Sequence, residues 1–411
     1  MTMENIRSKH QMHNSSSKKT LRVLHLFSPS FGFRFSGHEK RWMWQFETWS
    51  KQEIQHLVLY PENYTVKNAF PLETSHRNKT YNRKSRALWV VKTLISIVKN
   101  KGNFDLLHVH TQNWGGLLAG TLTHLLGRKS IYEISLMSSD NPSALRMEKY
   151  GSMKLAIFRN FNRFLCTTSL CAEDCIENGI PKDKIELIVS SVDSNLYKPI
   201  SAESKLSTRV KYHFLLDKKI LLFVGSIKKR KGIDIILEIY EKLKEQRSDC
   251  ILLLIGPDSS KQSSGIDDQY VNFYKERYKS QIEDRSIIFT GRVDSREILA
   301  EYYQIADIFI FSSINEGLPN VILESMASGL PTIATNLRGI TDFLIKDQKN
   351  GFLFESSNIE YAVSIINMLL GDPNLSRRIS FSARSYIMEN HSFQMWQNKI
   401  VEMYQNLVAG S

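Results

Sequence analysis

Two carboxylates, Glu316 and Glu324, carry the clearest chemical signal of the sequence. The apolar run 307–311 before them is typical of a buried strand, Pro319 suits a first helical position and Gly329 suits a helix end. Glu316 is therefore expected just before a helix, and Glu324 more than one turn inside it. Because carboxylates accept hydrogen bonds from hydroxyl groups, we expect a sugar beside Glu316 and a ribose beside Glu324.

The first turn of the same helix offers a place for phosphate. Backbone N–H groups at a helix N-terminus have no partner within the helix, and the helix dipole adds to their attraction for anions. Two solvated glutamates at an ordinary helix start are the alternative, which the surrounding glycine, proline and strand context disfavours. The residues expected at this anion site are Leu318, Pro319, Asn320 and Val321.

A second candidate site follows the apolar segment 219–224, where a glycine leads into four consecutive basic residues. Cations beside a departing diphosphate stabilise the negative charge that develops on it and so lower the barrier. We expect Lys231 to have this role, with help from Lys228 or Arg230, whereas Lys229 is expected to be a solvated surface charge. A solvated basic turn or a localisation signal is the alternative for the whole run.

The N-terminal half contains two further candidates. Gly37 follows the strand-like segment 21–27 and precedes an expected helix, and a glycine there lets backbone amides approach a diphosphate closely. His108 and His110 alternate along the strand-like segment 106–110. His110 stands at the carboxyl end of that segment, where open α/β sheets bind their ligands. We expect His108 to be a structural histidine and leave both the structural and the catalytic interpretation open for His110.

Strand-like and helix-compatible segments alternate along both halves, which predicts an α/β fold whose parallel sheets are covered by helices on both faces. The pattern restarts after the polar segment 199–218, which we expect to be the linker. The predicted strands are 21–27, 55–60, 106–110, 130–134 and 164–168 in the first half, and 219–224, 250–255, 286–289, 308–311 and 331–334 in the second.

This pattern also predicts the domain boundaries. We expect a disordered tail at 1–20, an N-terminal Rossmann-like domain at 21–199 and a C-terminal Rossmann-like domain at 200–391. The final helix, within 392–411, is expected to join the first domain.

Composition agrees with two domains and an anionic ligand. A chain of 411 residues exceeds what one hydrophobic core usually supports, and its formal net charge of +12 favours an anionic partner. We see no apolar stretch long enough to span a membrane and no signal peptide at the start. The four cysteines do not suggest a disulfide framework or a metal site, so we expect reduced thiols and a location on the cytosolic side.

Several motifs are missing from the sequence. Neither half has a G-x-G-x-x-G fingerprint after its first strand, and there is no G-x-x-x-x-G-K-[ST], which weighs against dinucleotide-dependent enzymes and P-loop NTPases. The basic residues lack the aromatic interleaving of a nucleic-acid-binding module, so we expect no nucleic-acid partner.

The ordered motifs resemble those of family 4 of the GT-B-fold glycosyltransferases, enzymes that transfer sugars from nucleotide donors with retention of configuration. Glu316 and Glu324 match the Glu-x7-Glu motif of that family, and Lys231 matches its phosphate-binding lysine. Further matches occur in the family's order at Gly179–Pro181, Lys184–Ile185, Val192–Asp193, Tyr197–Pro199, Val224–Gly225, Phe289–Val293, Tyr302–Tyr303, Ala306–Asp307 and Asn350–Leu353.

This resemblance implies a GT-B fold, in which two Rossmann-like domains face each other across a cleft. The nucleotide-sugar donor would bind mainly the C-terminal domain, with its base near Arg292 and Val293, its ribose on Glu324, its diphosphate on Lys231 and its sugar against Glu316. The other large glycosyltransferase fold holds a divalent cation with an Asp-x-Asp triplet, which this chain lacks. We therefore expect no metal ion and no cofactor in the reaction.

The sequence also departs from the family at several positions. Ser226 stands where the family often has an arginine, and Ser36 replaces the first glycine of its Gly-Gly-x-Glu loop. Ser135 stands where many relatives have a sugar-contacting histidine, two residues after Glu133, and Ser190–Ser191 replace the usual Asn-Gly. These differences suggest a subfamily with its own acceptor. A glycan, a lipid-linked acceptor and a small molecule all remain open, as do a non-catalytic donor-binding subunit and an epimerase or phosphorylase of the same fold.

A basic and apolar segment, Arg83–Lys101, bears on location. Such a helix can lie at an anionic membrane surface, which would place the protein peripherally at the inner face of the membrane. Packing of the apolar stripe on the sheet is the alternative, and we prefer it. The stripe comprises Leu88, Val91, Leu94 or Ile95, and Val98.

Overall fold

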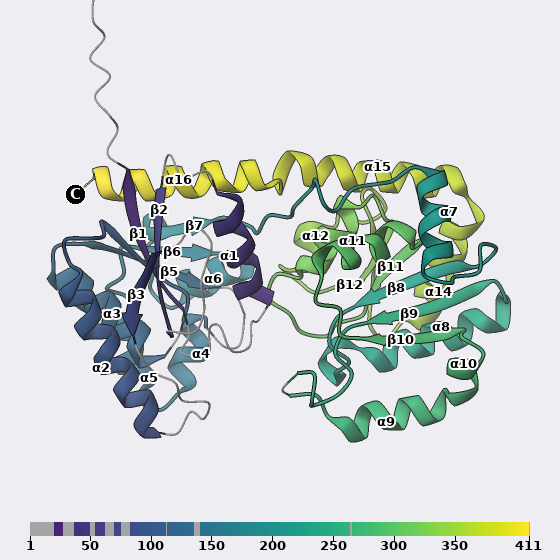
Figure 1. The fold of residues 1–411 in the computed structure, drawn as a ribbon, viewed down its shortest axis with the longest axis horizontal. Coiled ribbons are helices and arrows are strands. Elements are labelled where there is room, and N and C mark those ends of the chain that lie inside the picture. The colour runs from purple at the N-terminus through teal and green to yellow at the C-terminus, as the bar shows by residue number, and fades with distance from the viewer. Residues whose placement is uncertain are drawn as a thin grey trace, which may run out of the picture.

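A computed structural model of the chain describes residues 20–27, 37–49, 54–61, 70–74, 83–111, 113–134, 140–263 and 265–410. Most of the predicted tail, residues 1–19, lies outside the described residues, and so do Ser36 and Ser135. The described chain folds into two halves, each built on one parallel sheet with helices on both of its faces (Figure 1). The predicted α/β class with two Rossmann-like units is confirmed.

The N-terminal half contains a seven-stranded sheet in the order β3-β2-β1-β4-β5-β6-β7, and every neighbouring pair is parallel. Chain order reverses between β1 and β4, which makes that boundary the expected ligand crevice of the sheet. The strands are β1 (Leu21–Leu26), β2 (Ile54–Pro61), β3 (Phe70–Thr74), β4 (Leu106–Val109), β5 (Lys129–Ile134), β6 (Arg163–Cys166) and β7 (Ile185–Leu187). The helices are α1 (Gly37–Thr48), α2 (Arg83–Lys99), α3 (Trp114–Leu125), α4 (Pro142–Met147), α5 (Gly151–Phe158) and α6 (Ser169–Glu177).

The C-terminal half contains a six-stranded parallel sheet in the order β10-β9-β8-β11-β12-β13, with its reversal between β8 and β11. The strands are β8 (Lys219–Val224), β9 (Cys250–Ile255), β10 (Ile287–Gly291), β11 (Ile308–Phe311), β12 (Thr332–Thr335) and β13 (Phe352–Phe354). The helices are α7 (Ala202–Lys211), α8 (Ile233–Gln246), α9 (Asp268–Arg277), α10 (Lys279–Glu283), α11 (Arg296–Ile305), α12 (Asn320–Ala327), α13 (Thr341–Leu344) and α14 (Ile359–Gly371).

Two consecutive helices, α15 (Pro373–Asn390) and α16 (Phe393–Ala409), connect the halves, running one after the other along the same side of the molecule (Figure 1). Ile379 and Ala383 of α15 belong to the hydrophobic clusters of the C-terminal half. Trp396 and Tyr404 of α16 instead pack with Trp42 of α1 in the core of the N-terminal half. The chain thus crosses twice between the halves, and the crossings are joined by a hydrogen bond from the Val192 amide to the His391 carbonyl, 3.0 Å long.

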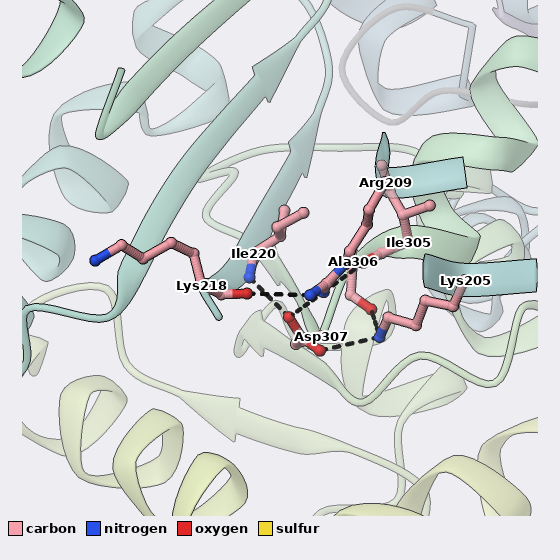
Figure 2. Close-up of polar contacts among 7 residues, drawn as sticks. All are labelled: Lys205, Arg209, Lys218, Ile220, Ile305, Ala306 and Asp307. Carbon is pink, nitrogen blue, oxygen red and sulfur yellow. Dashed lines mark hydrogen bonds and ion pairs between the residues drawn. The ribbon is translucent and has the colours of Figure 1, made fainter. Parts of the chain in front are cut away.

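The predicted linker 199–218 is not an open connection, because it contains helix α7. Figure 2 shows how Asp307, at the start of β11, holds this helix. Its carboxylate accepts hydrogen bonds from Lys205 Nζ at 2.9 Å, from Arg209 Nη2 at 2.6 Å and from the Ile220 amide at 2.8 Å. Burial would raise the pKa of Asp307, but Lys205 and Arg209 outweigh it and lower that pKa. The polar composition of the linker therefore reflects a helix fixed to the sheet by ion pairs.

Helix α2 corrects a second expectation. We predicted that its apolar stripe packs on the sheet, but Leu88, Val91, Ile95 and Val98 are each 45–51% exposed. Its other face, with Thr93, Ser96 and Ile97, is buried instead. The stripe is therefore a surface feature of the N-terminal half.

Two other observations concern the chain as a whole. Among the described residues, no helix is both long and apolar enough to cross a membrane. All four cysteines are buried free thiols, as expected.

Candidate functional site

The candidate site of the C-terminal half lies where the chain leaves β8 and β11. A 3-10 turn, Lys229–Lys231, follows β8 and ends at Gly232, whose φ is +64°. A Cβ atom at Gly232 would stand 1.9 Å from the carbonyl oxygen of Ser312, just beyond β11. The glycine therefore permits both the left-handed backbone and the contact between the two loops, and so brings Lys231 to the β11 loop.

Glu316 is the centre of this site. Its Oε1 atom accepts hydrogen bonds from Lys231 Nζ and, at 3.0 Å, from Ser313 Oγ, and it forms an ion pair with Arg230 Nη1, also at 3.0 Å. Burial alone would raise the pKa of the Glu316 carboxyl, but Lys231 and Arg230 outweigh it and lower that pKa. Glu316 is thus an ionised carboxylate, as its predicted contact with a sugar requires.

The surroundings of Glu316 carry an excess of positive charge. Burial, together with the nearby charges of Arg230 and Lys231, lowers the pKa of Lys228. Arg230 is the most open of the cations on Glu316, with 44% of its side chain exposed against 17% for Lys231. Lys231 and Arg230 pair with Glu316 and Lys228 lies near both of them, so positive charge exceeds negative charge here and favours an added anion. Arg230 is therefore well placed to act where Ser226 has replaced the family's arginine.

Helix α12 begins at Asn320, so Pro319 is its N-cap and not the first helical residue that we predicted. Of the four residues expected at its anion site, Pro319 has no N–H, so Leu318, Asn320 and Val321 supply the amides. Four residues into the helix, Glu324 Oε2 accepts a 2.9 Å hydrogen bond from the hydroxyl group of Tyr303. We had not singled out Tyr303 for this role, although the family's Tyr-Tyr pair contains it.

The expected base-binding loop follows β10. Gly291 has a φ of +70°, and the next residue, Arg292, is exposed. Gln262 fixes Arg292 from two sides, since its Oε1 accepts from the Arg292 amide at 3.2 Å and its carbonyl accepts from Arg292 Nη1 at 3.0 Å. Val293 packs on the apolar cluster of this half, and Arg292 also pairs with Asp294 at 2.8 Å.

The N-terminal candidates have a different environment. Gly37 begins helix α1, close to the position predicted for a helix start. The His110 ring is completely buried, with its Nδ1 atom 2.7 Å from Glu133 Oε2 and its Nε2 atom 3.0 Å from His25 Nδ1. Both ring nitrogens are therefore engaged inside the protein. The catalytic interpretation of His110 remains a prediction, which in this geometry requires an indirect role.

His108 is a buried structural histidine, as we preferred. Its Nδ1 atom lies 2.6 Å from the hydroxyl oxygen of Tyr404 in α16. Sequence reasoning missed the rest of this buried cluster, because it named Glu133 only as a neighbour of Ser135 and did not name His25, His56 or Trp42. Strand pairing was the signal that could have found one of them, since His25 of β1 is the parallel-register partner of His108 of β4, which had been named.

A cation–aromatic contact joins the two halves. The Arg296 guanidinium lies 4.8 Å from the ring centroid of Trp44 in α1 and forms a 3.2 Å ion pair with Asp193. Gln45 adds a 3.2 Å hydrogen bond from its Nε2 atom to Ser191 Oγ. The crossing segment, with the Val192–Asp193 motif, thus has partners in both halves.

Known proteins share this sequence pattern and this fold. The sequence profile of the family described as "Glycosyl transferases group 1" matches residues 205–386. An uncharacterized glycosyltransferase from Haemophilus influenzae is 29% identical over 55% of this chain, and a mannosylfructose-phosphate synthase from Agrobacterium fabrum is 27% identical over 62%. The chain spans less than two thirds of those relatives, 56% and 59% of their lengths.

Two further similarities cover more of the chain. A UDP-Gal:alpha-D-GlcNAc-diphosphoundecaprenol alpha-1,3-galactosyltransferase from Escherichia coli is 24% identical over 78% of this chain and 80% of its own length. An Anabaena protein solved in complex with UDP and glucose superposes with a TM-score of 0.72 over 93% of this chain and 99% of its own, at 16% identity. The second similarity concerns the fold alone.

Proposed function

Since this chain belongs to the group 1 glycosyl transferases, we propose that it is a retaining hexosyltransferase of family 4, using a UDP- or GDP-sugar as donor. The observation that carries this proposal is the pairing of Lys231 and Arg230 with Glu316, with Lys228 near both cations, at the reversal point of the C-terminal sheet. An ionised carboxylate among excess cations suits a ligand that combines a sugar with a diphosphate.

The proposed donor pose follows from the loops of the C-terminal half. The diphosphate binds Lys231, Arg230 and the first amides of α12, and the sugar binds Glu316. The ribose hydroxyl groups bind Glu324, which Tyr303 holds in place. The base lies at the Arg292–Val293 loop. Gly37, at the start of α1, faces the diphosphate from the N-terminal half.

The proposed chemistry needs no protein nucleophile. The bond between the anomeric carbon and the phosphate oxygen breaks, and the acceptor oxygen bonds to the anomeric carbon on the same face. The acceptor's proton passes to the departing phosphate oxygen, while Lys231 and Arg230 stabilise the negative charge that develops there. We propose that these cations and the α12 amides take the place of a divalent metal ion, so that transfer needs neither a metal nor a cofactor.

We further propose a glycan or lipid-linked acceptor and a peripheral location at the cytoplasmic face of a membrane. Two observations support this. The Escherichia coli relative is named for a diphosphoundecaprenol substrate, and α2 exposes an apolar stripe that ends in the basic residues Lys99 and Lys101. The free thiols agree with a reducing compartment.

Turnover with a panel of UDP- and GDP-sugars, in the presence and absence of lipid-linked acceptors, tests the proposal. A transferase releases nucleoside diphosphate only when an acceptor is present, above a slow hydrolysis background. Donor binding without turnover would favour the non-catalytic subunit, and acceptor-independent conversion of the sugar would favour the epimerase. Turnover that disappears in EDTA and returns with Mg²⁺ or Mn²⁺ would contradict the metal-free mechanism.

A further inference from the structure

A chain of buried polar side chains crosses the core of the N-terminal half. Trp42 Nε1 donates to Glu133 Oε2 at 2.9 Å, and the same oxygen lies 2.7 Å from His110 Nδ1. His110 Nε2 lies 3.0 Å from His25 Nδ1, and His25 Nε2 lies 2.9 Å from His56 Nδ1. The imidazoles thus form a row that begins at one carboxylate and crosses β5, β4, β1 and β2.

One carboxylate fixes the proton positions of the whole row. Glu133 Oε2 accepts from the Trp42 N–H, and as the acceptor for His110 as well it requires His110 to carry its proton on Nδ1 and leave Nε2 as an acceptor. His25 must then donate from Nδ1, which leaves its Nε2 atom to accept from Nδ1 of His56. The row ends at His56 Nε2, which is buried without a hydrogen-bond partner. With the protons placed in this way, His56 Nε2 is an acceptor, and buried acceptors without a partner are less rare in proteins than buried N–H groups without one.

The residues at the carboxylate end of the row are buried, which excludes direct contact with a substrate. The side chains of His110 and Glu133 are 0% and 1% exposed, so neither group touches a substrate. The His110 ring is also stacked on Phe27, with ring centroids 4.3 Å apart and an interplanar angle of 7°. A ring held by a carboxylate, an imidazole and an aromatic face has one orientation. The row therefore works through position and not through contact.

The row lies next to the edge of the sheet where ligands bind. Glu133 is the last but one residue of β5, and His110 directly follows β4 at the β1–β4 reversal point. The next residue, Thr111, accepts a hydrogen bond on its Oγ1 atom from Asn113 Nδ2 at 2.9 Å, and Asn113 caps α3. His110 is thus followed directly by the residue that holds the capped start of α3.

We propose that Glu133 is a positioning residue of the acceptor side, because its carboxylate sets the tautomers of His110, His25 and His56 and thereby fixes the loop after β4. The proposal rests on the proposed transferase function, whose acceptor enters from the N-terminal half.

Two-bond ¹H–¹⁵N NMR of the histidine-labelled protein at pH 7.5 tests the row directly. We expect His110, His25 and His56 in the Nδ1–H tautomer, which is the less common form of free imidazole. Glu133→Gln should return at least His25 and His56 to spectra with Nε2–H character. Nε2–H on His25 and His56 in the unmodified protein would overturn the proposal, because the row would then run in the opposite direction.

Kinetics separate positioning from mere stability. Glu133→Gln should raise the acceptor KM about tenfold, the scale of one charge-assisted hydrogen bond, and leave donor affinity unchanged. Tyr404→Phe is the matched control: it removes the buried 2.6 Å hydrogen bond to His108 outside the row, and should lower the melting temperature without changing tautomers or acceptor KM. Equal acceptor KM in Glu133→Gln and the unmodified protein would overturn the positioning role.

Two further results have defined meanings. One ring nitrogen from each of His25, His108 and His110 lies within 4.8 Å of the others, so metal analysis of the purified protein belongs to the test. Stoichiometric zinc would overturn the row, because a bound ion needs the lone pairs that the hydrogen bonds use. Absence of turnover with every donor would count against the proposed function, while the NMR spectra, which need no turnover, would still decide the row.

Discussion

The two halves place their polar groups at equivalent positions and use them in opposite ways. Each parallel sheet reverses its chain order once among the described strands, between β8 and β11 in one half and between β1 and β4 in the other. At the first reversal Lys231 and Arg230 are partly open to solvent and pair with the buried carboxylate of Glu316. At the second, the imidazole rings of His25 and His108 have no exposed surface. The C-terminal half thus presents charged side chains for direct contact with a ligand, whereas the N-terminal half keeps its polar side chains buried, where they act only by positioning other groups.

The largest effect is expected where the charge contact is removed. Lys231→Ala should lower kcat by about 10²–10³-fold, the loss typical of one preorganised group that stabilises developing charge. Nucleoside diphosphate affinity should fall as well, because Glu316 would keep Arg230 as its cation and hold it away from phosphate. Steady-state kinetics and calorimetry with the nucleoside diphosphate measure both quantities.

Lys229 provides the matched control for this prediction. It lies in the same turn and carries the same charge, but it is exposed and forms no ion pair in the part of the chain that the structure describes. Lys229→Ala should retain nearly full activity. Equal losses in the two variants would mean that the general positive potential matters more than the contact with Glu316.

Low pH should destabilise the N-terminal half more than the C-terminal half. Burial lowers the pKa of His56 to about 3, and burial together with the neighbouring imidazoles lowers the pKa of His25 well below its usual value. The unfolded chain binds these protons at about pH 6.5, so stability is lost as the pH falls from about 6.5 toward 3. Each such histidine contributes about 1.4 kcal/mol per pH unit across that window. The lowered pKa values of Glu316 and Asp307 affect stability only at lower pH. The stability that these two carboxylates contribute is fully present above about pH 4 and is lost as the pH falls through their folded-state pKa values.

Intrinsic tryptophan fluorescence can follow the unfolding of the N-terminal half without an added label. All six tryptophans lie outside residues 200–391, and Trp42, Trp49 and Trp396 pack together in the N-terminal core. Urea titrations followed by tryptophan emission should show falling stability of the N-terminal half between pH 6.5 and 4.5. Hydrogen exchange of β8 and β9 should change little over the same range. Coincident loss in both halves would show that they unfold as one unit, and His56→Phe should flatten the slope.

Sequence reasoning named more residues of the proposed donor side than of the proposed acceptor side, for a physical reason. Lys231, Glu316 and Glu324 are proposed to touch a ligand class whose chemistry restricts residue type and spacing, and a linear motif can record such residues. The row from Glu133 to His56 is assembled by strand pairing between residues far apart in the chain, and no local spacing encodes it. Most strands were predicted from their apolar runs, whereas β7 and β13 have only three residues each and β3 contains a proline and a glutamate, so these three were missed. Helix α7 was missed because ion pairs to Asp307, and not an apolar face, hold it.

A smaller effect is expected at the ribose contact. Glu324→Ala should weaken nucleotide binding about tenfold through loss of a charge-assisted contact, with little change in preference among donor sugars. Tyr303→Phe removes only the 2.9 Å hydrogen bond that orients Glu324 and should cost about fivefold. Calorimetry with UDP and GDP measures both, and Glu297→Ala, an exposed carboxylate on α11, is the control. A changed sugar preference with unchanged nucleotide affinity would move Glu324 from the ribose to the sugar.

The smallest effect concerns the membrane, where the N-terminal half should again differ from the C-terminal half. Val91 and Ile95 are 51% and 48% exposed on the α2 stripe, so Val91→Glu with Ile95→Glu should remove apolar contact with lipid without opening a core. We expect vesicle binding to fall several-fold on anionic vesicles, since shallow apolar insertion and a few basic residues of about 1 kcal/mol each act together. Charge reversal of the basic residues that begin α2, at Arg83, Lys84 and Arg86, should give a similar loss at low salt and none at high salt.

Phe381 supplies the control for the membrane prediction. It is 75% exposed on α15, in the C-terminal half, so Phe381→Glu makes the same kind of change away from α2. Co-sedimentation with neutral and anionic vesicles at low and high salt should leave this variant unchanged, and donor affinity should be unchanged in every variant. Equal binding to neutral and anionic vesicles, or equal loss in Phe381→Glu, would remove α2 from the membrane interaction and leave its apolar stripe as a surface for a protein partner.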